Sequence, residues 1–98
     1  MNLQAVKDFR DFCASQGRET VIDHSSLDSC AMGLYADSLG TSSLTVGCNL
    51  AKPMSEVCGV GFYNTLGSIV EAPIEFPTFG VLTIKLNARI IAYEAEHA

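Results

Sequence analysis

The stretch from residue 25 to residue 40 carries its own helix start and stop signals, which limits what this chain can fold into. Ser25 is placed to cap a first turn, and Asp28, three residues later, completes an approximate capping box. Gly40 supplies the left-handed residue that ends many helices. Between them, apolar residues recur at the three-and-four spacing of one buried face: Leu27, Cys30, Ala31, Leu34, Tyr35 and Leu39. We therefore expect a helix over residues 26–39 at the centre of the core.

The N-terminal segment predicts a second helix. Residues 3–16 lie between Asn2, a suitable N-cap, and Gly17, which ends the helix. Lys7 and Asp11 have opposite charges at i and i+4, a spacing that stabilises helices. The apolar stripe consists of Leu3, Val6, Phe9, Phe12 and Cys13. The two phenylalanines are expected in the core, because an aromatic stripe at helical spacing usually faces inward.

The segment from Leu82 to Ile90 shows two conflicting periods. Apolar and polar residues alternate throughout, which is typical of a half-buried strand. Thr78, after Pro77, is nevertheless a suitable helix cap. A helical stripe is also present, formed by Phe79, Leu82, Leu86, Ile90 and Tyr93. From the residues alone, helix and strand are equally supported.

The middle of the chain is mixed. Residues 41–48 begin with hydroxyl side chains and then alternate, which predicts a loop followed by a short strand. Residues 52–70 keep a helical spacing, with Pro53 suited to a first helical position. Three glycines interrupt that window, each costing about 1 kcal/mol relative to Ala in a helix. Residues 71–77 contain two prolines and read as a linker.

The glycine-rich stretch from Gly59 to Gly67 superficially resembles a phosphate-binding loop. It lacks the Lys-Ser/Thr ending of a P-loop and the G-x-G-x-x-G spacing of dinucleotide-binding folds. We therefore exclude nucleotide binding here, and expect the glycines to permit close packing or a bend.

These patterns predict one domain over residues 1–98, mainly α, with three to four helices and a short strand or extended middle. The expected helices are 3–16, 26–39 and 78–95. The alternative is an α+β fold, in which residues 43–48, 57–63 and 81–91 form a small antiparallel sheet.

Location follows from the absence of sorting features. The first residues mix charged and apolar side chains, unlike a signal peptide. No run approaches the about 18 apolar residues of a membrane span. The four cysteines contain no Cys-x-x-Cys pair, and Cys13 and Cys30 fall on apolar helix faces, as buried free thiols do. A cytoplasmic protein is therefore predicted.

The search for catalytic chemistry finds little. His24 lies six residues before Cys30, and a Cys-His nucleophile pair can be imagined. A buried Cys30 would be a poor nucleophile, because burial raises a thiol pKa. His24, Asp23 and one cysteine match no known metal-ligand spacing. The sequence predicts no enzyme, no metal and no cofactor.

Charge is the remaining functional signal. The formal net charge is −5, and residues 1–37 hold six acidic against three basic residues. An acidic chain repels nucleic-acid phosphates, so the expected partner is a protein with a basic surface. The candidate partner-binding residues are Asp8, Asp11, Glu19, Asp23 and Asp28.

Two short motifs add a resemblance. Residues 30–35 read Cys-Ala-Met-Gly-Leu-Tyr, and residues 78–82 read Thr-Phe-Gly-Val-Leu, followed by Leu86. This chain thereby resembles small proteins of phages and mobile elements with a Cys-Ala-x-x-x-Tyr helix and a Thr-Phe-Gly-x-Leu-x-x-x-Leu helix. The match covers about a third of the chain and does not extend to its glycine-rich middle. The resemblance implies a helical C-terminal segment and a phage or prophage origin, and therefore a location in the cytoplasm of a bacterial host cell. It implies no catalytic residue.

The functional expectation is a small, acidic, non-enzymatic interaction protein. It would inhibit a host or defence protein by binding its surface, as anti-CRISPR proteins do. The alternative is a small-molecule-binding or structural module, with the glycine-rich middle lining a pocket. A homodimer through an exposed apolar face is a further option, because 48% of the residues are hydrophobic.

Overall fold

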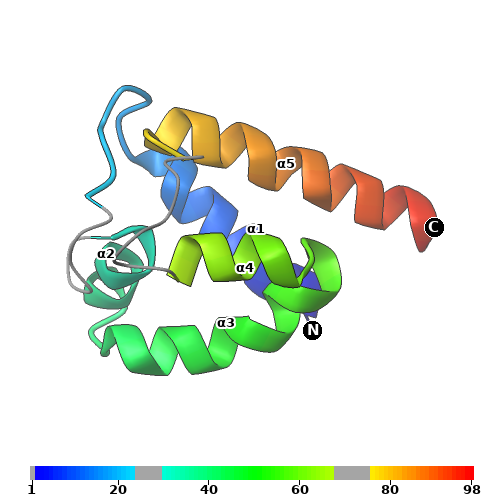
Figure 1. Ribbon diagram of the computed structural model, residues 1–98, viewed down its shortest axis with the longest axis horizontal. Helices are drawn as coiled ribbons and strands as arrows, with labels where there is room; N and C mark the ends of the chain where they lie inside the picture. The colour runs from blue at the N-terminus through cyan, green and yellow to red at the C-terminus, as the bar shows by residue number, and fades with distance from the viewer. Residues whose placement is uncertain (1, 24–29, 68–75) are drawn as a thin grey trace.

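The computed structural model describes residues 2–23, 30–67 and 76–98 (Figure 1). These residues form five helices and no strand: α1 (Asn2–Ser15), α2 (Ala31–Ser38), α3 (Ser43–Val57), α4 (Val60–Gly67) and α5 (Phe79–Glu96). The predicted helical class is confirmed. The α+β alternative is wrong, because residues 43–48 and 81–91 lie within helices and residues 57–63 span a helix–helix junction.

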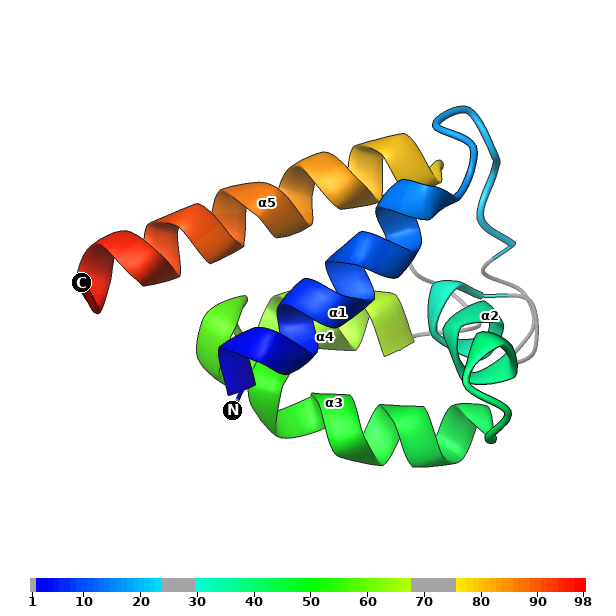
Figure 2. The ribbon, with the colours of Figure 1, turned by 180° about the vertical axis from the view of Figure 1, so that it is seen from behind.

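Helix α1 crosses the middle of the fold (Figures 1 and 2). α5 and α3 lie on opposite sides of the fold, with α1 and α4 between them. α1 makes its most extensive contacts with α5 and α3, whereas α2 packs mainly against α3. The expectation that the 26–39 helix occupies the centre of the core is therefore wrong. Part of that stretch does form α2, but α1 holds the central position.

Helix α2 is shorter than predicted. It begins at Ala31, and the side chain of Cys30 caps it by accepting from the Gly33 backbone N–H at 3.4 Å. The proposed capping residues Ser25 and Asp28 lie outside the described residues. Leu39, assigned to the buried stripe, is 57% exposed because the helix has already ended there.

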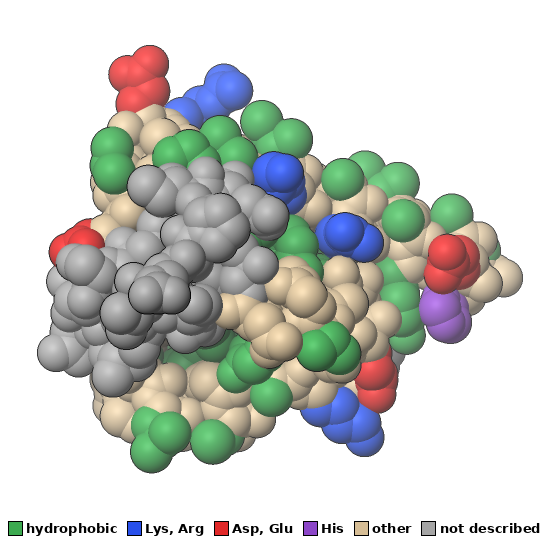
Figure 3. Space-filling view, viewed as in Figure 1, with side chains coloured by type: hydrophobic (Ala, Val, Ile, Leu, Met, Phe, Trp, Pro, Cys, Tyr) green, Lys and Arg blue, Asp and Glu red, His purple; other side chains and the backbone are tan. Residues whose placement is uncertain are grey.

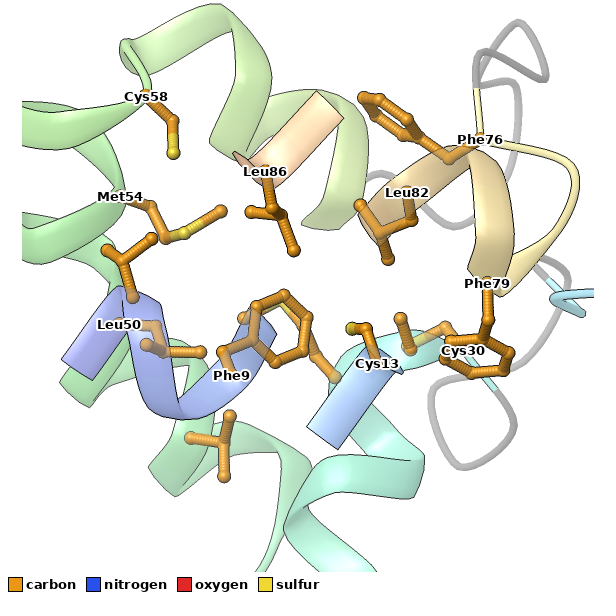
Figure 4. Close-up of a cluster of buried hydrophobic side chains, with 14 of the residues drawn as sticks. Phe9, Cys13, Cys30, Leu50, Met54, Cys58, Phe76, Phe79, Leu82 and Leu86 are labelled. Atoms are coloured by element: carbon orange, nitrogen blue, oxygen red, sulfur yellow. The ribbon is translucent and has the colours of Figure 1, made fainter. Parts of the chain in front are cut away.

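The core is one cluster of side chains from all of the longer helices (Figure 4). Phe9 of α1 and Leu86 of α5 are fully buried, facing Met54 of α3. Tyr35 of α2 stacks at a tilt on Phe9, with ring centroids 5.2 Å apart. The predicted apolar face of the first helix is confirmed at Val6, Phe9 and Cys13.

Helix α3 replaces the loop and strand predicted over residues 41–48. Its start signal is Ser42, whose hydroxyl accepts from the Thr45 backbone N–H at 3.2 Å. Pro53 lies inside α3 rather than at a first turn. Proline there removes one backbone hydrogen bond. Burial of Pro53 with Met54 against the core favours the helix despite that loss.

Two residues, Cys58 and Gly59, separate α3 from α4. Gly59 has φ of +94°, a conformation that side-chain-bearing residues rarely adopt. The chain therefore turns at Gly59, and the helical spacing on either side belongs to two helices. This resolves the mixed signal of residues 52–67.

Helix α5 confirms the helix predicted over residues 78–95. The Thr78 hydroxyl accepts from the Val81 backbone N–H at 3.3 Å and caps it. The segment after α1 turns at residues 17–20 and then lies beside this start, where Val21 and Thr78 form an isolated antiparallel bridge. The backbone N–H groups of Phe79 and Gly80 donate to the carbonyls of Thr20 and Arg18, at 3.1 and 3.0 Å. The first turn of α5 is thus tied to the 17–22 segment.

We predict that Gly80→Ala destabilises the protein by about 1–3 kcal/mol, the range found for overpacked sites. An added Cβ would lie 2.6 Å from the backbone oxygen of Arg18, so the backbone itself must move. Gly61→Ala is the matched control, because no described atom lies within 4 Å of its added Cβ. It should stabilise α4 by about 0.5–1 kcal/mol. Urea unfolding measures both, and equal effects would contradict the tight contact at Gly80.

Candidate functional site

Helix α5 is apolar on two opposite faces. Its inner face buries Phe79, Leu82, Leu86 and Ile90. Its outer face carries Ile84 and Ile91, which are 61% and 66% exposed. Val81, Ile84, Ala88 and Ile91 follow the i, i+3, i+7, i+10 spacing of one helix face, and we call them the outer stripe. The alternation that resembled a strand is produced by these two interleaved helical faces.

The outer stripe begins in a groove. A hollow of about 800 Å³ lies between residues 17–20 and the first turns of α5, and Val81 and Ile84 line one wall. Ile84 also borders a second hollow of about 250 Å³ on the side of α1. Figure 3 shows a row of hydrophobic side chains along α5. Large exposed side chains beside a groove are typical of interaction sites.

Basic side chains flank the outer stripe. Lys85 lies over the ring of Phe76, with its Nζ 5.7 Å from the ring centroid, and Arg89 lies over the ring of Phe62 at 6.0 Å. The two rings contact each other, with centroids 4.9 Å apart. These cation–π contacts hold both cations beside the stripe. Arg18 adds a third cation at the groove.

The predicted acidic residues do not form one cluster with the stripe. Asp8 and Asp11 are exposed on α1; Asp8 accepts from Gln4 at 2.8 Å, and Asp11 pairs with Arg10 at 2.7 Å. The predicted Lys7–Asp11 pair is replaced by Lys7–Glu94, at 3.2 Å, which links α1 to α5. Glu19 lines the groove.

Asp23 and Asp28 are the remaining two predicted partner-binding residues. Asp23 is exposed in the segment that follows the Val21–Thr78 bridge. Asp28 lies outside the described residues. Of the four predicted partner-binding residues that the structure describes, Glu19 is therefore the one at the groove.

The cysteines are free thiols. Cys13 and Cys30 are buried, as predicted, and Cys58 is buried as well, while Cys48 is exposed. Desolvation by burial raises the pKa of Cys13 from 9.0 to about 12. The same cause raises the pKa of Cys58 from 9.0 to about 11, partly offset by the charge of Arg89. The imagined partner of Cys30, His24, lies outside the described residues.

These buried thiols predict alkaline destabilisation. Because their pKa values are raised on folding, the unfolded chain loses its thiol protons first as the pH rises above about 9. Stability is fully present below about pH 9 and falls through pH 11–12. Between pH 8 and 11, the free energy of unfolding should fall less steeply with pH in Cys13→Ala than in the unmodified protein. The slope in Cys48→Ser should equal that of the unmodified protein, because Cys48 is exposed. An unaltered slope in Cys13→Ala would contradict burial of that thiol.

The described part of the chain contains no group of three or more His, Cys, Asp or Glu side chains placed to hold a metal ion. None of its helices combines the length and apolarity needed to cross a bilayer.

Sequence reasoning missed the outer stripe. The signal was present in the double period of residues 81–91, which contains more apolar positions than a single buried helix face requires.

Comparison of the chain with protein-family models, with curated proteins and with solved structures finds no match.

Proposed function

We propose that this protein is a non-enzymatic interaction protein whose binding surface is the outer stripe of α5 with its flanking groove. The observation that carries the proposal is the exposure of Ile84 and Ile91, at 61% and 66%, on one face of the longest helix. Fully burying one such side chain stabilises a complex by about 1.5–3 kcal/mol. Because Ile84 and Ile91 lie on one helix face together with Val81 and Ala88, they form a contiguous apolar stripe of the kind that marks interaction sites.

Charge defines the partner. Lys85 and Arg89 lie beside Ala88 of the stripe, and residues 79–93 contain no acidic residue. The groove at the start of the stripe carries one charge of each sign, from Arg18 and Glu19. We propose a partner that presents an apolar ridge with acidic flanks, as an amphipathic helix does. A second copy of this chain fits less well, because its own α5 would bring the same basic residues to the interface.

The resemblance to phage proteins gives the biological context of the proposal. Binding would block a host or defence protein, as anti-CRISPR proteins do. Binding of a basic surface by Asp8, Asp11, Glu19, Asp23 and Asp28 stays a separate prediction, tested by reversing those charges.

Affinity capture of tagged protein from bacterial lysate, at low and high salt, tests the proposal. Lys85→Glu combined with Arg89→Glu should lower partner recovery at low salt, because the flanking charges then repel. Asp8→Lys combined with Asp11→Lys is the matched reversal on α1 and should leave recovery unchanged. Loss of the partner in the α1 variant alone would place binding on the acidic residues instead. Recovery of a second copy alone would make the surface a homodimer interface.

A further inference from the structure

Another cavity lies apart from the outer stripe, where α2, α3 and α4 meet. Its volume is about 350 Å³, within the roughly 300–1,000 Å³ of small-molecule sites. The walls come from Met32 of α2, Leu44 and Ala51 of α3, and Tyr63 of α4. Three helices thus contribute to one concave surface.

The walls of this cavity are apolar and held in place. The Tyr63 hydroxyl donates to the Gly47 carbonyl oxygen at 2.7 Å, which fixes the ring against α3. Because its proton is already donated, the Tyr63 hydroxyl can only accept a hydrogen bond from a ligand, beside the apolar ring face. Leu44 is 76% exposed at the cavity, so a bound molecule would cover apolar surface that now contacts water.

The polar groups at the cavity are few and neutral. Ser43 and Cys48, on successive turns of α3, supply a hydroxyl and a thiol. Cys30 also lines the cavity, and its sulfur accepts from the Gly33 backbone N–H. None of the described residues that line the cavity carries a carboxylate, ammonium or guanidinium group. A charged ligand would lose its hydration without gaining an opposite charge, which is unfavourable.

We infer that this cavity binds a small, neutral, mainly apolar molecule with at most one or two hydrogen-bonding groups. The apolar body would lie among Met32, Leu44, Ala51 and the Tyr63 ring, with its polar group toward Ser43 and Cys48. The site is independent of the proposed partner-binding surface on α5, so either can fail without the other.

The test uses N-phenyl-1-naphthylamine, a neutral apolar fluorophore, titrated with the full chain. We expect saturable binding of one equivalent and a rise in fluorescence. Ala51→Leu adds three carbons to the cavity wall and should weaken binding about tenfold or more. Ala92→Leu makes the same change at an exposed position on α5 and should leave the affinity unchanged.

The exposed thiol provides a second readout at the same place. Cys48 should react with N-ethylmaleimide faster than the buried Cys13 and Cys58, and saturating fluorophore should slow its reaction about fivefold or more, since it lines the cavity. Mass spectrometry of peptides from the modified protein identifies the site. No saturable binding, equal affinity in Ala51→Leu, or an unprotected Cys48 would each overturn the inference.

Discussion

Replacing Ile84 by Asp is expected to reduce partner capture about tenfold or more while the protein stays folded. Ile84 is 61% exposed, so the free protein loses little packing. In the complex, the substitution removes apolar burial worth about 1.5–3 kcal/mol and places a carboxylate in a water-excluded contact. Each 1.4 kcal/mol of lost binding free energy corresponds to about tenfold in affinity.

Val60→Asp is the matched control for Ile84→Asp. Val60 is 59% exposed and begins α4, so the same loss of an exposed apolar side chain occurs away from α5. An acidic residue at a helix N-terminus is also well tolerated. Quantitative capture and thermal unfolding of both variants provide the measurement. Equal loss of capture in the two variants would contradict a role for the outer stripe.

Replacing Phe9 by Ala is expected to lower the free energy of unfolding by about 3–5 kcal/mol. Phe9 is fully buried at the crossing of α1 with α3 and α5, and its ring contacts Tyr35. Removing it leaves a cavity that rigid helices cannot fill. Such a loss is a large part of the stability of a small domain.

Phe12→Ala makes the same change three residues later on α1. Phe12 is half-buried, with its ring 5.1 Å from Tyr35 and 6.4 Å from Phe79. Phe12→Ala should lower the free energy of unfolding by less than Phe9→Ala does, because water can enter part of the vacated space. Chemical denaturation of the two variants measures the difference. A larger cost at Phe12 would contradict the placement of Phe9 at the centre of the core.

Local signals predicted the first and last helices well. The stripe Val6, Phe9 and Cys13 is buried as expected, and Thr78 caps α5 as expected. Asn2, predicted as the cap of the first helix, is instead the first residue of α1, so that helix was predicted from its single clear period. The last segment also alternated like a strand, and there the helical stripe and the Thr78 cap agree with the helix that forms.

The middle of the chain was predicted poorly for a physical reason. Ser42 is an ordinary cap, but a cluster of hydroxyl residues around it has the composition of a loop. Proline is enriched at the first position of helices. Pro53 nevertheless lies inside α3, where it is buried against the core. Gly59 ends one helix and allows the next to begin, a distinction that spacing alone cannot make.

The candidate binding surface was missed because composition drew attention to charge. The acidic residues are spread over α1 and the segment after it, and Asp11 already has an intramolecular partner. The outer stripe was visible only as an apparent strand pattern. In a helix, Ile84 and Ile91 point away from the buried Leu86. The apolar residues that the core does not need therefore form an exposed face of α5.

The outer stripe as the partner-binding surface is tested most directly by site-specific photo-crosslinking in bacterial cells. A p-benzoylphenylalanine replaces Ile91 in one variant and Asp8 in another, both exposed positions on helices. The proposal predicts a single crosslinked protein from position 91, abolished by adding Ile84→Asp, and none from position 8. A partner crosslinked from position 8 but not from position 91 would contradict it.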